Sequence, residues 1–79
     1  MEIQIRLFAT LTKYLPPGAD GRTAHLTVPD GATVAQVLDQ LGIPPGFSKL
    51  LMVDGVHRGQ DAVLEPGCVL SVFPPIAGG

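Results

Sequence analysis

The sequence predicts an α+β domain of two layers, in which one main helix packs across one face of a mixed sheet of four to five strands. Three observations lead to this class. Apolar residues alternate in two runs within the first 28 residues, an amphipathic helical pattern follows, and short strand-like runs make up the rest of the chain. The 79 residues suffice for one such domain, and the helix is long enough to cross its sheet.

The first strand is predicted at residues 2–8. Ile3, Ile5 and Leu7 fall on one face of this run, and mostly polar side chains fall on the other, which is typical of a half-buried strand. Phe8 is the exception, because it is an apolar residue on the outer face.

A short helix is expected after this strand, with Thr10 as its N-cap. Leu11, Tyr14 and Leu15 have the i, i+3, i+4 spacing of one apolar helical face. Residues 16–18, Pro-Pro-Gly, end this helix, and a loop follows it.

Three further runs are expected to form strands. Residues 24–28 alternate and end at the turn 29–31, Pro-Asp-Gly. Residues 49–53 form an apolar run that Asp54-Gly55 joins to residues 56–58. Because Asp-Gly is a preferred pair for the tightest turns, this segment predicts a β-hairpin.

The main helix lies between these runs and is expected to be about nine residues long. Thr33 and Gln36 have the spacing of a capping box, in which each side chain bonds the backbone N–H of the other residue. Gly42 suits a left-handed C-terminal residue, Ile43 can fold back on the last turn, and Pro44-Pro45 prevents extension. The apolar face of the helix comprises Val34, Val37, Leu38 and Leu41.

The last strand is predicted at residues 69–73, after a tight turn at Pro66-Gly67. Its core face comprises Cys68, Leu70 and Val72. A right-handed crossover would lay this strand parallel to the first, as in a β-grasp fold. Phe73 would then share the uncovered face of the sheet with Phe8. Two apolar residues together there predict a docking patch, and packing under surface loops is the alternative.

Composition and charge exclude several functional classes. The net charge of -2, with five scattered basic residues, gives no positive stripe for a nucleic-acid backbone. No apolar run approaches the roughly 18 residues of a membrane span, and the first residues lack the pattern of a signal peptide. We therefore expect a cytoplasmic protein that binds neither nucleic acid nor membrane.

Residues that could carry chemistry within the domain are few. Cys68 is the only cysteine, so no internal disulfide can form, and it is expected to be a small core residue. His25 and His57 lie far apart and lack neighbouring metal-ligating residues, which argues against a metal site. No nucleophile–base pair, paired carboxylates or glycine-rich phosphate loop is present, so we expect no enzyme active site.

The segment 74–79, Pro-Pro-Ile-Ala-Gly-Gly, predicts a flexible tail beyond a domain formed by residues 1–73. Prolines cannot continue a central strand, and six extended residues reach about 20 Å. Glycine keeps the chain narrow enough to thread a channel. Attack of the Gly79 carboxylate on a nucleotide phosphate would form a mixed anhydride, which a sulfur or nitrogen nucleophile could open. The alternative is a frayed tail without function.

The chain resembles the MoaD/ThiS family of ubiquitin-like sulfur carriers. The likeness rests on residues 73–79, Phe-Pro-Pro-Ile-Ala-Gly-Gly, and on residues 7–9, Leu-Phe-Ala. It extends over the whole chain, including residues 29–34 before the helix and the turn at 65–67. The Phe-Pro-Pro ending is most similar to the small subunit of molybdopterin synthase.

This resemblance implies a ubiquitin-like β-grasp carrier that is a substrate of enzymes. An ATP-dependent activating enzyme would adenylate the Gly79 carboxylate, and sulfur transfer would convert it to a thiocarboxylate. ATP would serve the activating enzyme, and the carrier would bind no cofactor stably. In the molybdopterin branch, the large synthase subunit would accept the sulfur. The threading residues would be Pro74, Pro75, Ile76, Ala77 and Gly78, and the docking residues would be Phe8, Phe73 and His57.

The identity of the sulfur acceptor stays open. The segment 44–46, Pro-Pro-Gly, is short where a molybdopterin synthase small subunit has a longer insertion. Thiamine thiazole synthesis, a tungsten-cofactor system or another acceptor are alternatives, although thiamine carriers usually lack the Phe-Pro-Pro ending. Two other classes fit the tail: a protein modifier joined through Gly79 to lysines of its targets, and a ubiquitin-like binding module with an inert tail.

Overall fold

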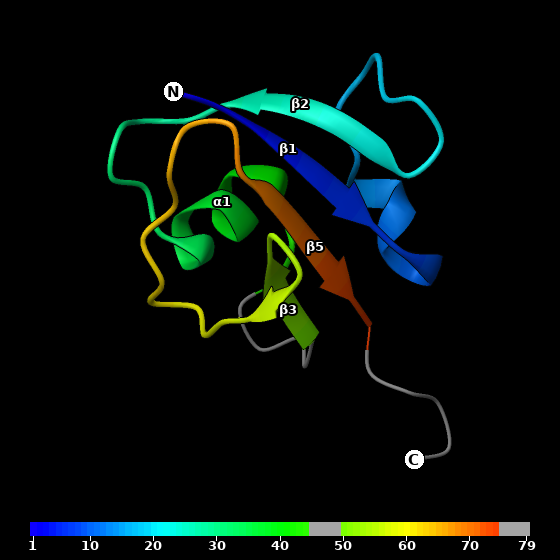
Figure 1. Cartoon of the computed structure of the whole chain (residues 1–79). Helices are drawn as coiled ribbons and strands as arrows, with labels where there is room; N and C mark the ends of the chain where they lie inside the picture. Colours follow the sequence, from blue (N-terminus) through cyan, green and yellow to red (C-terminus); the bar gives the residue numbers. More distant parts are fainter. Residues whose placement is uncertain (45–49, 75–79) are drawn as a thin grey trace.

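In the computed structural model, which describes residues 1–44 and 50–74, five strands form one mixed sheet with the order β2-β1-β5-β3-β4. The helix α1 packs on one side of this sheet, as Figure 1 shows. The elements in chain order are β1 (Glu2–Leu7), the 3-10 helix η1 (Ala9–Tyr14), β2 (Thr23–Thr27), α1 (Val34–Leu41), β3 (Leu50–Val53), β4 (Val56–His57) and β5 (Val69–Phe73). This is the ubiquitin-like β-grasp fold that the sequence predicts.

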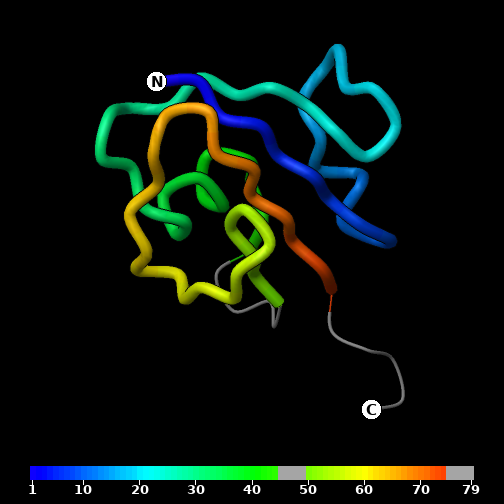
Figure 2. The backbone as a smooth tube through the Cα atoms, viewed as in Figure 1, coloured from blue at the N-terminus to red at the C-terminus, as the bar shows by residue number. Residues whose placement is uncertain are grey.

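The two central strands, β1 and β5, run parallel. Their register pairs Gln4 with Val69 and Leu7 with Val72, and all other neighbouring strands are antiparallel. The ends of β1 and β5 therefore lie at the same end of the sheet, as the backbone trace shows (Figure 2). We call this the tail end, because residue 74 follows β5 there.

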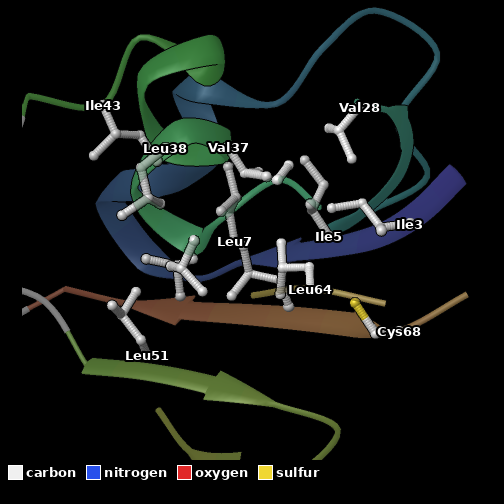
Figure 3. Packing of buried hydrophobic residues seen from close by; sticks show 14 of the residues in the cluster. Ile3, Ile5, Leu7, Val28, Val37, Leu38, Ile43, Leu51, Leu64 and Cys68 are labelled. Atoms are coloured by element: carbon white, nitrogen blue, oxygen red, sulfur yellow. The ribbon is translucent and has the colours of Figure 1, made fainter. Parts of the chain in front are cut away.

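The core between α1 and the sheet confirms the alternation of the strands. Ile3, Ile5 and Leu7 of β1 are buried, as are Leu70 and Val72 of β5. Figure 3 shows the three β1 side chains packed near Val37 and Leu38 of α1, together with Cys68, which is buried as predicted. Burial of this apolar surface is the main source of stability for such a small domain.

The main helix begins and ends where the sequence predicts. The Gln36 backbone N–H donates to Thr33 Oγ1 at 3.3 Å, and the Thr33 N–H donates to Gln36 Oε1 at 2.8 Å, so the capping box is complete. Gly42 has the left-handed φ of 84°, and the Ile43 N–H folds back to donate to the Leu38 carbonyl at 3.0 Å. The helix has eight residues, one fewer than expected.

The prediction that Thr10 caps the short helix is wrong. Ala9 has a φ of 53°, which turns the chain directly after β1, so the helix begins at Ala9 with Phe8 at the cap position. Phe8 offers no capping side chain, and Thr10 lies inside the first turn. The segment forms a 3-10 helix that buries Leu11 completely.

The last strand, β5, has the predicted bounds, and the boundaries of the other strands differ from expectation by no more than one residue within the described chain. Val28 lies just beyond β2, where its N–H donates to the Met1 carbonyl at 2.8 Å. The predicted start of the third strand at Lys49 lies outside the described residues. Asp54 and Gly55 have φ values of 50° and 81°, which are typical of the tight turn that their sequence predicts.

Within the described chain, no helix has the length and apolar character needed to span a membrane.

Candidate functional site

Two aromatic rings at the tail end of the sheet form the centre of the candidate site. Phe8 and Phe73 stack with their ring centroids 4.2 Å apart and their planes inclined by 12°. The parallel pairing of β1 and β5 brings them together, because Leu7 pairs with Val72 and the Phe8 N–H donates to the Val72 carbonyl at 3.2 Å. Both rings are half-buried and lie on the face opposite α1, as the sequence predicts.

Two apolar residues of β3 extend this face, and the sequence reasoning missed both. Leu50 lies opposite Phe73 and is 43% exposed, and Met52 lies opposite Ser71. Their side chains point away from the core because Leu51, between them, is buried. The alternation of β3 could have revealed this, but only if its register with β5 were known. We call Phe8, Phe73, Leu50 and Met52 the aromatic face.

His57, the third predicted docking residue, lies on the same side of the sheet but at its edge. It belongs to β4, where it pairs with Met52 of β3, and its side chain is exposed. The strand β3 separates it from Phe73 on β5. The structure therefore places His57 at the margin of the aromatic face.

Two arginines also meet at this site without having been predicted there. The guanidinium carbons of Arg6 and Arg22 lie 5.7 and 5.8 Å from the ring centroid of Phe8. Arg6 shares the outer face of β1 with Phe8, whereas Arg22 arrives from the loop before β2, held by a 2.9 Å bond from the Leu7 N–H to its carbonyl. Cations at this distance from a ring interact favourably with it.

The predicted tail begins beside this site. Pro74 follows Phe73 directly and is half-buried. The other predicted tail residues, Pro75, Ile76, Ala77, Gly78 and Gly79, lie outside the described residues. The aromatic face and the start of the tail are thus adjacent in the chain as well as in space.

The rest of the described surface offers less to a ligand. Residues 1–44 and 50–74 contain no cluster of three histidine, cysteine or acidic side chains placed to hold a metal ion. A groove of about 210 Å³ lies beside the β3–β4 hairpin, where Val53, Val56, Arg58 and Val63 help to line it. None of the predicted site residues lines this groove.

The β-grasp fold of this chain is that of the small ubiquitin-like carrier and modifier proteins. The chain belongs to the ThiS family, whose sequence profile matches residues 5–79. Members of this class are carriers or modifiers rather than catalysts in themselves.

Individual relatives support this assignment. Small archaeal modifier protein 3 of Haloferax volcanii is 32% identical over 96 residues, with both chains covered completely. The crystal structure of SAMP1 from Haloferax volcanii has a TM-score of 0.74 and 26% identity, with full coverage of both chains. A protein of Pyrococcus furiosus assigned as molybdopterin converting factor subunit 1 has a TM-score of 0.71 at 20% identity, covering 95% of this chain and 98% of that one. At 20% identity, the likeness to the Pyrococcus furiosus protein shows a shared fold alone.

Proposed function

We propose that this protein is a sulfur carrier whose Gly79 carboxylate is activated and then loaded with sulfur. A carboxylate oxygen attacks the α-phosphorus of ATP on an activating enzyme, and the bond to pyrophosphate breaks. Hydrosulfide or an equivalent donor then attacks the carbonyl carbon of the acyl adenylate. AMP leaves with its electron pair, and Gly79 retains a thiocarboxylate. The protein itself positions the reacting carbon, and the activating enzyme supplies the ATP site.

The single observation that carries this proposal is the stacked pair of Phe8 and Phe73 directly before the tail. A partner protein can bind an aromatic face of this kind while residues 74–79 enter the active site of that partner. In this proposal the prolines at 74 and 75 serve as the lever of the segment, residues 76 and 77 continue it, and Gly78, which has no side chain, suits passage through a narrow channel of the partner. His57 contacts the partner from the margin of the aromatic face.

Molybdopterin synthesis is the pathway that we propose for the sulfur. The supporting features are the Phe73-Pro74-Pro75 sequence and the aromatic pair, together with the shared fold of the Pyrococcus furiosus protein. The large subunit of molybdopterin synthase is then the acceptor, and both steps take place in the cytoplasm. A thiamine, tungsten-cofactor or other acceptor would use the same thiocarboxylate.

Protein conjugation is a second candidate function, and the relative named small archaeal modifier protein 3 favours it. In this case, the lysine amine of a target opens the acyl adenylate or a thioester derived from it, and an isopeptide bond to Gly79 forms. Both functions need the same first step. They differ only in the nucleophile that the activated carboxylate meets.

Intact-mass measurement of the purified full chain tests the proposal. The chain is incubated with ATP, its activating enzyme and sulfide, and we expect a gain of about 16 Da at Gly79, the difference between sulfur and oxygen. If the activating enzyme catalyses pyrophosphate exchange with this chain but the mass does not increase, the sulfur-carrier function is contradicted. Conjugates of higher mass that link Gly79 to lysine would indicate the modifier function instead.

A further inference from the structure

Most charged side chains on the strands and their turns are divided by sign between the two ends of the sheet, and Asp20, in the loop before β2, is an acidic exception at the tail end. Arg6 and Arg22 lie at the tail end, and Lys13 follows on η1. Acidic residues mark the opposite end, at the start of β1, in the turn after β2, in the β3–β4 turn and in the turn before β5; they are Glu2, Asp30, Asp54 and Glu65. The tail end is therefore locally positive although the chain has a net charge of -2.

The two arginines are available to a partner. Both are exposed, and both lie within 6 Å of the same Phe8 ring. Asp20, in the turn that precedes Arg22, is the acidic residue nearest to it in the sequence. Among residues 1–44 and 50–74, however, neither arginine forms an ion pair with Asp20 or with any other carboxylate. Water solvates these two exposed charges, and the described part of the fold supplies no carboxylate within ion-pair distance, so both guanidinium groups can pair with carboxylates of a partner.

We propose that Arg6 and Arg22 bind carboxylates on an acidic surface of the activating enzyme, next to the site that receives the aromatic face. A guanidinium group can donate two parallel hydrogen bonds to one carboxylate. Contact with the Phe8 ring limits the positions that each guanidinium group can take. This inference rests on the proposed function. It names the activating enzyme because adenylation is the step that sulfur carriage and protein conjugation share.

The charge distribution also gives the pair a role in the rate of encounter. An acidic enzyme surface attracts the positive tail end and repels the acidic opposite end, so the carrier approaches with its tail leading. Such steering depends on salt, because exposed charges are screened within about 10 Å at 0.1 M ionic strength.

The test is ATP–pyrophosphate exchange by the activating enzyme, measured against concentration of the full carrier chain at low and at high NaCl. The double variant Arg6→Gln/Arg22→Gln removes both charges. Arg58→Gln is the control for position, with one charge removed instead of two, because Arg58 is exposed but lies beyond β4 at the far edge of the sheet. Thermal unfolding of each chain confirms that the fold is intact.

For the double variant at low salt, we expect a KM for the carrier about tenfold higher than wild type, with little change in kcat. Its KM should also lose most of its salt dependence, whereas Arg58→Gln should resemble wild type. The variant Arg6→Lys/Arg22→Lys keeps both charges and should recover most of the salt dependence.

Equal KM and equal salt dependence for the double variant and wild type would overturn this inference alone. A loss in Arg58→Gln that is as large per charge removed would also overturn it, because the effect would then follow net charge and not position. Absence of exchange with the wild-type chain, on an enzyme competent with another carrier, would overturn the proposed function and this inference with it.

Discussion

The rings of Phe8 and Phe73 stack with their centroids 4.2 Å apart, on the face of the sheet that α1 leaves open. The two residues stand at opposite ends of the domain sequence, at the close of β1 and of β5. The parallel register of these central strands is therefore what creates the aromatic face. Any change that shifts this register by one residue would turn one ring into the core.

A double-mutant cycle should measure this contact. Phe8→Ala and Phe73→Ala are expected to couple by about 0.5–1.5 kcal/mol in the free energy of unfolding, because stacked aromatic pairs gain that much beyond burial. Urea denaturation of the four chains gives the coupling. As a control, Phe8→Ala should show no coupling with Val63→Ala, since Val63 is 64% exposed and does not line the aromatic face.

Capping residues give a second prediction. Thr33→Ala should lower the free energy of unfolding by about 1 kcal/mol, because it leaves the Gln36 N–H without its partner and breaks the capping box. Thr10→Ala removes the same atoms from an exposed threonine that caps no helix, and should change stability by less than about 0.5 kcal/mol. Equal losses would contradict the finding that Thr10 caps no helix.

The centre of the sheet should tolerate truncation poorly. Leu70 is completely buried in β5, so Leu70→Ala is expected to cost about 2–5 kcal/mol, much of the stability of a domain this small. Val69 precedes it in the same strand and faces outward. Val69→Ala should cost less than half as much, as thermal or urea unfolding of the two variants can show.

Deletion of the last two glycines distinguishes the contribution of the tail to activity from the contribution of the domain to stability. A chain that lacks Gly78 and Gly79 should unfold at the same temperature as wild type, yet should support no pyrophosphate exchange, because the reacting carboxylate is misplaced. A pull-down with the activating enzyme provides the control, since the aromatic face is intact and binding should persist. Retention of full cellular function by the truncated chain would point to a binding module with an inert tail.

Local patterns in the sequence predicted most of the fold. The alternation of Ile3, Ile5 and Leu7 fixed the inner face of β1, and Thr33, Gln36 and Gly42 marked both ends of α1. Each of these signals involves residues close together in the chain. The error at Thr10 has a different origin, because the positive φ of Ala9 follows from the turn after β1 and not from capping preferences.

The candidate site was predictable only in part, because it depends on contacts between distant segments. Phe8 and Phe73 could be paired once β1 and β5 were taken as parallel. The position of Leu50 required the β3–β5 register, and that of Arg22 required the path of the loop before β2. Neither leaves a local pattern that sequence reasoning can detect.

The place of β5 has a consequence for the synthesis of this protein. Of the strands in the sheet, β5 is the last to be translated, yet it lies in the middle, between β1 and β3. A nascent chain that stops before β5 leaves β1 and β3 without a shared neighbour, so the two halves of the sheet can join only once β5 has been synthesised. Because β5 contributes Phe73, the aromatic face that partners would contact forms only after this strand has joined the sheet.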